Sequence, residues 1–138
     1  MTPTDRVVAT ESAVELLTKL SELHGGLMIH QSGGCCDGSA PMCYPAGEFR
    51  VGSRDVLLGE IELPEPLPAV RVWIQGDQYE LWKHTQLILD VVPGRGAGFS
   101  LEAPEGVRFL ARSRVFDESE NTWLDACPPR RGADVVVD

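Results

Sequence analysis

Three of the chain's four cysteines lie within nine residues, in a glycine-rich stretch that begins with a histidine. Residues 30–43 read HQSGGCCDGSAPMC and contain His30, Cys35, Cys36 and Cys43. Thiolate sulfur and imidazole nitrogen are donors that zinc and softer metals take in proteins. The three glycines of the stretch let its backbone adopt the positive φ angles needed to fold back on itself. We therefore predict a metal site with Cys35, Cys36, Cys43 and His30 as its ligands.

The identity of the metal is left open by these donors. Their spacing is not that of a zinc finger, which has two separated C-x-x-C knuckles. For a single ion, the cysteine pair can count as one donor, with His30 and Cys43 as the other two. The lack of an obvious further donor favours an open, functional site, which Cys127, Asp37 or a second subunit could complete. Met42 adds a thioether that suits Cu(I). The predicted cofactor is thus a metal ion (Fe, Zn or Cu) or an iron–sulfur unit.

Three other interpretations of the cysteines need no metal. One cysteine near His30 could be a low-pKa thiolate that carries sulfur or captures an aldehyde. The cysteines could instead be small buried hydrophobic residues, as free cysteines often are. Finally, the loop could only shape an interface with a partner protein.

Length and charge narrow the functional classes. The 138 residues suit a single domain, with a compact part at about 9–116 and a C-terminal tail at about 117–138. A net charge of −9 disfavours nucleic acid and anionic membranes as partners. The N-terminus lacks the pattern of a secretory signal, and no apolar run is long enough to span a bilayer. We therefore expect a cytoplasmic protein, whose thiols are more often ligands or nucleophiles than disulfides.

The elements that must position these residues are one helix and a series of short strands. Apolar residues recur every three or four positions over 11–23, which predicts an amphipathic helix. Ser12 with Glu15, or Thr10 alone, can cap its start, and Gly25 and Gly26 can end it. Runs of Val, Ile, Leu and aromatic residues between Gly and Pro predict strands near 27–32, 48–51, 55–62, 70–75, 79–82, 85–92, 98–102 and 107–115.

Two of these strands differ in their patterning. Residues 87–92 are apolar almost throughout, which predicts a strand buried on both faces. In VRVWIQ, by contrast, Val70, Val72 and Ile74 alternate with more polar or aromatic positions, which predicts one core face. The predicted fold class is α+β: an N-terminal helix packed on small mixed or antiparallel β-sheets. Pairing of sheet edges in a homodimer is compatible with it.

Two segments carry a resemblance to a known family. HGGLMIHQSGGCCDGSAPMCYP at 24–45 and GFSLEAPEGVRF at 98–109 resemble a bacterial family, domain of unknown function 779, over most of residues 9–116. Members of that family are often encoded beside aldehyde dehydrogenases. The resemblance therefore implies an accessory role in aldehyde or alcohol oxidation, with an aldehyde dehydrogenase as partner. It supplies no catalytic residues.

The order of elements also resembles, more distantly, the A-type iron–sulfur carriers with the HesB or IscA-like sandwich fold. That likeness follows the helix at 11–23, the strand at 27–32, the Gly34-Cys35 loop and the Gly98-Phe99 strand. The carriers have a Cys-Gly-Cys pair after the last of these strands, and this chain has none there.

Taken together, these features predict a non-enzymatic accessory protein that binds a metal ion or iron–sulfur unit. The alternative is a thiol-based enzyme or chaperone-like partner that uses a reactive cysteine on an aldehyde or on an aldehyde dehydrogenase.

Overall fold

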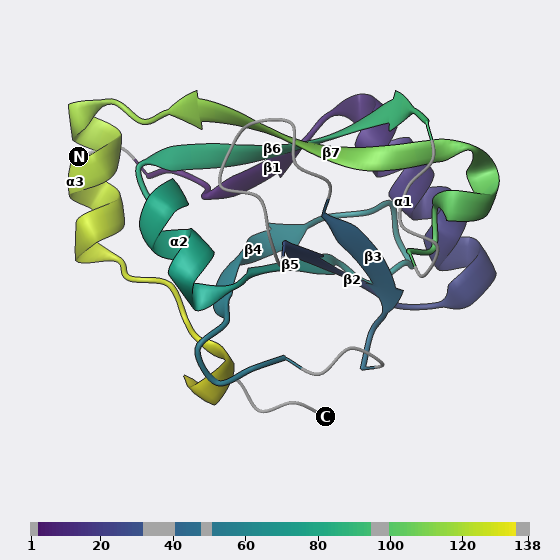
Figure 1. Cartoon of the computed structure of the whole chain (residues 1–138), viewed down its shortest axis with the longest axis horizontal. Helices are drawn as coiled ribbons and strands as arrows, with labels where there is room; N and C mark the ends of the chain where they lie inside the picture. Colours follow the sequence, from purple (N-terminus) through teal and green to yellow (C-terminus); the bar gives the residue numbers. More distant parts are fainter. Residues whose placement is uncertain (1–2, 32–40, 48–50, 95–99, 135–138) are drawn as a thin grey trace.

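Two β-sheets face each other and enclose the main hydrophobic core (Figure 1). The computed structural model describes residues 3–31, 41–47, 51–94 and 100–134. Sheet A has the strand order β1 (Val7–Ala9), β6 (Thr85–Pro93), β7 (Val107–Val115), and sheet B has the order β3 (Met42–Pro45), β2 (Leu27–Gln31), β5 (Val70–Ile74), β4 (Val56–Ile61). Both sheets are mixed, because β1 runs parallel to β6 and β2 runs parallel to β5. The predicted α+β class is confirmed, and the HesB-like detail stays a prediction.

The core between the sheets consists of the inward-facing residues of both. Sheet A contributes Leu87, Leu89 and Phe109 to this core. Sheet B contributes further buried apolar residues, which include Val70 and Val72. Each of these side chains is at most 2% exposed. Burying a large apolar side chain stabilises a fold by about 1.5–3 kcal/mol, so this layer is the main source of stability.

The N-terminal helix α1 (Glu11–His24) confirms the prediction for 11–23. Its apolar stripe, which includes Leu17 and Leu20, packs against β6 and β2. The Thr10 hydroxyl, rather than the capping box at Ser12, accepts the Ala13 N–H. Gly25, at a φ of 83°, ends the helix in a conformation that favours glycine. The helix thereby closes one side of the space between the sheets.

Two predicted strands are wrong in the described part of the chain. Residues 79–82 belong to helix α2 (Gly76–Trp82), because Tyr79 and Trp82 face the core at a spacing of three residues. Seven residues are too few for that period to stand out from an alternation. Residues 100–102 form a turn before the 3-10 helix η1 (Ala103–Glu105), and residues 98–99 lie outside the described residues, as do 48–50 of another predicted strand.

Strand β6 is buried on one face only, so the prediction that it is buried on both faces is wrong. Leu87 and Leu89 are buried, whereas Ile88 and Asp90, which alternate with them, are half-exposed. The reason is that sheet B covers only the inner face of sheet A. The alternation predicted for Val70, Val72 and Ile74 is confirmed, since all three are completely buried.

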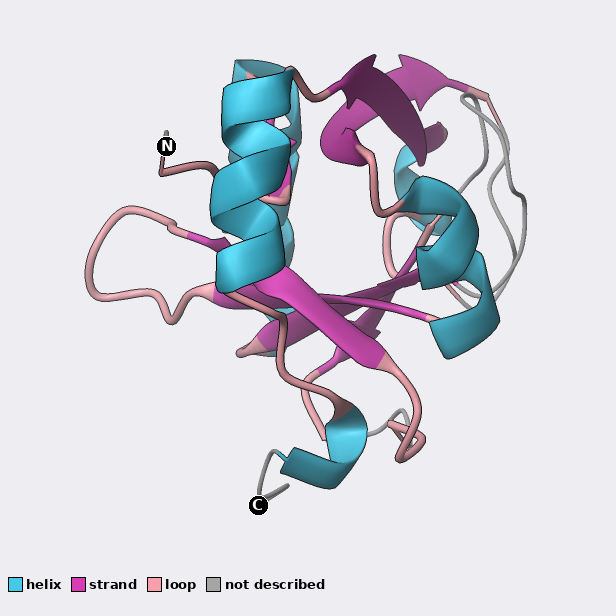
Figure 2. Cartoon of the chain, turned by 90° about the vertical axis from the view of Figure 1, so that its left-hand side faces the viewer, coloured by secondary structure: helices cyan, strands magenta, loops and turns pink. Residues whose placement is uncertain are grey.

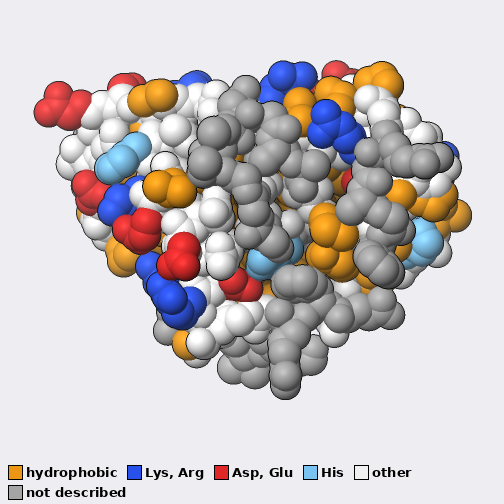
Figure 3. All heavy atoms as spheres, in the orientation of Figure 1, with side chains coloured by type: hydrophobic (Ala, Val, Ile, Leu, Met, Phe, Trp, Pro, Cys, Tyr) orange, Lys and Arg blue, Asp and Glu red, His pale blue; other side chains and the backbone are white. Residues whose placement is uncertain are grey.

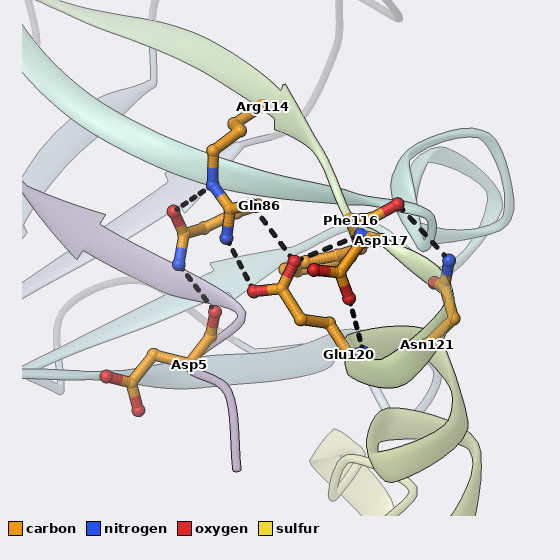
Figure 4. A network of polar contacts seen from close by, with 7 residues as sticks. All are labelled: Asp5, Gln86, Arg114, Phe116, Asp117, Glu120 and Asn121. Atoms are coloured by element: carbon orange, nitrogen blue, oxygen red, sulfur yellow. Dashed lines mark hydrogen bonds and ion pairs between the residues drawn. The ribbon is translucent and has the colours of Figure 1, made fainter. Parts of the chain in front are cut away.

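The C-terminal tail contains a helix that the sequence analysis missed. Helix α3 (Glu118–Ala126) starts at a capping box, in which the Asp117 carboxylate accepts the Glu120 N–H and the Glu120 carboxylate accepts the Asp117 N–H. Both guanidinium NH groups of Arg114, on β7, contact the Glu120 carboxylate at 3.0 and 2.8 Å (Figure 4). This contact fixes the start of α3 to sheet A, at the end of the molecule that faces the viewer in Figure 2.

After α3 the chain returns to sheet B as a short arm, residues 130–133. The Leu57 N–H donates to the Arg130 carbonyl, and Arg131 forms an isolated antiparallel bridge with Val56. These residues of the tail therefore pair at the edge of sheet B formed by β4. Among the described residues, no helix is long and apolar enough to cross a membrane.

Candidate metal site

The register of sheet B decides which predicted ligands lie together. In the β2–β3 pair, His30 is opposite Met42 and Ile29 is opposite Cys43. Directly opposed residues of an antiparallel pair share a face, while successive residues of one strand alternate between faces. His30 and Met42 therefore lie on the outer face of sheet B, which looks away from sheet A, and Cys43 lies on the inner face with Ile29.

His30 is buried on this outer face and contacts a carboxylate. Its Nε2 atom is 3.0 Å from Asp55 Oδ2, with the two side chains only 4% and 12% exposed. The same Asp55 oxygen accepts the Gly52 N–H at 2.8 Å. The sequence analysis did not identify Asp55. Its one signal is an acidic residue placed directly before the apolar run of β4.

The turn that carries Asp55 is fixed by the C-terminal arm. The Asp55 N–H closes the turn on the Gly52 carbonyl at 3.1 Å, and the Gly132 N–H donates to the Asp55 carbonyl at 2.7 Å. A Cβ atom on Gly132 would lie 1.9 Å from the Gly52 carbonyl oxygen, so only glycine allows this approach. The Ala133 N–H adds a contact to the Ser53 carbonyl at 3.1 Å. The arm thus supports the backbone from which the carboxylate reaches His30.

Apolar side chains surround the pair on the outer face. Met28, Leu57 and Trp73 form a small buried cluster, with Tyr44 and Val51 packed against it. Trp73 is the register partner of His30 in the β2–β5 pair and is 2% exposed. The outer face of sheet B is therefore dry around Trp73, unlike an ordinary solvent-facing sheet surface.

A hollow of about 300 Å³ adjoins Asp55 on the side of α2. Its lining includes Arg54 and Asp77, which form an exposed ion pair at 3.0 Å. Figure 3 shows acidic and basic side chains close together on the left half of this face of the molecule, so the charge there is mixed.

Cys43 has a different environment from His30. Its side chain is completely buried in the core between the sheets. Burial, with a smaller contribution from the Glu102 carboxylate, raises the pKa of the Cys43 thiol far above its ordinary value. Ser100 Oγ accepts the Cys43 N–H at 2.8 Å and donates to the buried Glu102 carboxylate, which ties β3 to the turn at 100–102. Cys43 is thus a protonated thiol in an apolar layer.

The structure therefore does not bring His30 and Cys43 together. Cys35 and Cys36 lie outside the described residues, so only their part in the predicted site stays a prediction. Cys127 is exposed at the end of α3. Across residues 3–31, 41–47, 51–94 and 100–134, no three His, Cys, Asp or Glu side chains gather as a metal site would require.

Comparison with known proteins gives one match. The model of a family described as a domain of unknown function, DUF779, matches residues 16–115. The matched part includes β2, β3 and Asp55 and ends at the last residue of β7, before α3 and the arm. No curated protein and no solved structure matches the chain.

Proposed function

The chain belongs to the DUF779 family, and from the surroundings of His30 we propose that it is an accessory protein that binds a metal ion or an iron–sulfur unit. The proposed protein ligands are His30, Cys35 and Cys36. Iron, zinc and copper are the candidate elements, because imidazole and thiolate suit all three.

The observation that carries this proposal is the 3.0 Å contact between His30 Nε2 and the Asp55 carboxylate. A histidine that binds a metal through one ring nitrogen commonly donates its other N–H to a carboxylate, which fixes the ring and raises the basicity of the ligand. Burial of both side chains keeps this orientation fixed.

The position of His30 in the chain also supports the proposal. It is the penultimate residue of β2, and Cys35 follows only five residues later. Five residues span at most about 18 Å, so the chain can return both thiolates to the imidazole without moving the sheet. An ion held there would connect the end of a rigid strand to the glycine-rich segment that follows.

Cys43 is left out of the proposed ligand set. It points into the core from the opposite face of sheet B, and it would have to lose a proton that burial stabilises. Its role is to pack between the sheets beside Ile29.

The proposed partner is an aldehyde dehydrogenase, as the family resemblance implies. The accessory role would then be to carry or deliver a metal in aldehyde or alcohol oxidation. Copurification of the untagged chain with an aldehyde dehydrogenase from its own host would support this part. A chain that binds metal but no such enzyme would overturn it.

Elemental analysis of the untagged protein, purified without oxygen, tests the metal site. We expect a stoichiometric amount of a transition metal, either as purified or after reconstitution. His30→Gln and the Cys35→Ser/Cys36→Ser double variant should each lose it, while Cys127→Ser serves as the matched control and should retain it. A wild-type chain that stays metal-free after reconstitution, or a His30→Gln chain that binds as well as wild type, would refute the proposal.

A further inference from the structure

We propose that one edge of sheet B is a binding site for an extended Arg-Gly segment of another protein, and that the chain's own arm occupies this site until such a segment displaces it. The edge site consists of the backbone of residues 52–57, where β4 begins, and of the Tyr79 and Glu80 side chains of α2. The inference goes beyond the proposed function and does not depend on it, because the site uses none of the proposed metal ligands.

The arm shows what the edge site accepts. It follows α3 and lies beside the segment that leads into β4 (Figure 1). The Leu57 N–H donates to the Arg130 carbonyl at 2.8 Å, and the Gly132 N–H donates to the Asp55 carbonyl at 2.7 Å. These two bonds flank the antiparallel bridge between the arm and β4. Extended peptides that add to a strand edge in other proteins gain affinity from such main-chain bonds, so the arm is bound as a peptide ligand would be.

The edge site requires glycine at one position of its ligand. A Cβ atom at Gly132 would overlap the Gly52 carbonyl. That carbonyl cannot move aside easily, because it accepts the Asp55 N–H, and the Gly52 N–H donates to the Asp55 carboxylate. The overlap is with backbone and not with the end of a flexible side chain, so every residue other than glycine is excluded here.

The position before this glycine selects arginine. The Arg131 guanidinium lies over the Tyr79 ring, 5.9 Å from its centroid, and donates to the Arg54 carbonyl at 3.3 Å. It is also 4.0 Å from the Glu80 carboxylate. A planar guanidinium can stack on an aromatic ring and donate from its edge at the same time, whereas the compact ammonium of lysine cannot. The ligand of the edge site is therefore an Arg-Gly pair in an extended segment.

The arm is held by few contacts, so a partner can displace it. Arg130 and Ala133 are exposed, and Arg131 and Gly132 are half-buried. The attachment of the arm thus depends on hydrogen bonds and one side chain rather than on burial of apolar surface. Segments with few buried apolar contacts open locally at low free-energy cost.

Geometry and charge favour a different protein over a second copy of this chain as the partner. Helix α3 ends at Ala126 and the pairing starts at Arg130, so only residues 127–129 join the two. This connection spans at most about 11 Å, so two copies could exchange arms only with their α3 ends pressed together. A separate basic segment has no such restriction, and it is attracted to a protein with a net charge of −9.

The test is an NMR titration of the ¹⁵N-labelled full chain with the free peptide PPRRGA, the sequence of residues 128–133. Gly132→Ala keeps the arm away from the Gly52 carbonyl and opens the edge site. We expect the peptide to shift the Leu57 amide signal of this variant. It should bind the wild-type chain at least tenfold more weakly, because the attached arm competes at a high effective concentration. Arg131→Glu, which places a carboxylate beside Glu80, is a second way to open the site and should give the same result.

Altered peptides test the two parts of the recognition. PPRRAA should not bind, because its side chain at the glycine position meets the Gly52 carbonyl. PPRAGA, which lacks the second arginine, should bind about two- to fivefold more weakly, as expected for the loss of an exposed cation–π contact. PPARGA is the matched control and should bind within twofold of PPRRGA, since the Arg130 side chain is exposed.

Three results would overturn the proposal. If PPRRAA binds as well as PPRRGA, the edge site does not select glycine. If neither opened variant binds PPRRGA more tightly than the wild-type chain does, the arm does not occupy a peptide site. If sedimentation shows a wild-type dimer that Gly132→Ala abolishes, the segment that enters from outside is the arm of a second copy, and the assignment to another protein is wrong.

Discussion

The two faces of sheet B are made by the same four strands and differ in their chemistry. On the inner face, Ile29 and Cys43 contribute only to packing, and the Cys43 thiol keeps its proton. On the outer face, His30 meets a carboxylate and Met42 meets a phenol. Residues adjacent in the sequence therefore belong to different environments. The comparison teaches that nearness in a cysteine-rich stretch does not imply a shared site once part of the stretch is a β-strand.

The largest expected effect concerns the reactivity of the inner-face thiol. In a Cys35→Ser/Cys36→Ser background, only Cys43 and Cys127 remain. Cys127 is exposed and should react with an alkylating reagent at once. Cys43 should react at least about 10³ times more slowly, because reaction requires opening of a core whose stability is of the order of 5–15 kcal/mol. Mass spectrometry of samples taken over a time course measures the number of alkylated cysteines.

The same thiol gives a pH dependence. Because the pKa of Cys43 is raised in the folded protein, its contribution to stability is complete below the unfolded value of about 8.5 and is lost as pH rises above it. Fast alkylation of Cys43 in the folded chain would contradict the assignment of this residue to the core.

Shortening an inner-face side chain should have the next largest effect. Ile29→Ala should lower the free energy of unfolding by about 2–5 kcal/mol, since Ile29 is completely buried and leaves a cavity. Met28→Leu, one residue away on the outer face, conserves volume and should cost less than about 1.5 kcal/mol. Urea denaturation measures both. If both variants lost the same free energy of unfolding, the prediction that the inner face contributes more to stability would be wrong.

Removing the outer-face charge should have a smaller effect. Asp55→Asn should cost about 1–3 kcal/mol, because His30 and the Gly52 N–H lose their carboxylate acceptor. The same change should weaken metal binding about 10–100-fold if His30 is a ligand. Asp77→Asn, on an exposed carboxylate paired with Arg54, is the control and should stay within about 0.5 kcal/mol. Indistinguishable results for the two variants would remove Asp55 from the site.

Detaching the arm should affect the outer face locally. Gly132→Ala forces the arm away from the Gly52 carbonyl and should cost about 1 kcal/mol, the size of one or two lost hydrogen bonds. Hydrogen exchange should accelerate at two amides: that of Leu57, which donates to the Arg130 carbonyl in the arm, and that of Gly132, which donates from the arm to the Asp55 carbonyl. Ala133→Ser, on an exposed side chain, is the control. Unchanged exchange at Leu57 would show that the arm does not stabilise this edge.

The smallest expected effect lies away from both faces, at α3. The Arg114 guanidinium and the Asp117 N–H lower the pKa of Glu120 to about 2. The contribution of this contact is therefore complete above the unfolded value of about 4.3 and is lost as pH falls towards 2. As the pH is lowered through this range, the NMR signals of α3 should shift at a higher pH than those of sheet B. Glu118→Gln, in the same first turn of α3, is the control and should keep the wild-type pH profile. If Glu120→Gln also keeps the wild-type pH profile of the α3 signals, the prediction is wrong.

Much of the fold could be predicted from local patterns. The stripe of α1 and the alternation at Val70, Val72 and Ile74 each repeat over several turns or residues, so their periods are clear. Helix α3 had a usable signal as well, since Asp117 and Glu120 have the spacing of a capping box. Helix α2 and strand β3 could not be predicted in this way, because seven and four residues hold too few repeats to fix a period.

The candidate site divides in the same way. Residue types alone identified His30 and the cysteine-rich stretch, and the thioether of Met42 as a soft donor. Asp55 could not be found, because it lies 25 positions from His30 and meets it only after β4 and β2 enter one sheet.

By itself, the sequence determined which donors this protein has and which segments prefer helix or strand, since composition and period are properties of the chain. Only the tertiary structure decided that His30 shares a face with Met42 and not with Cys43. That choice depends on strand register, and a shift of one residue would have reversed it.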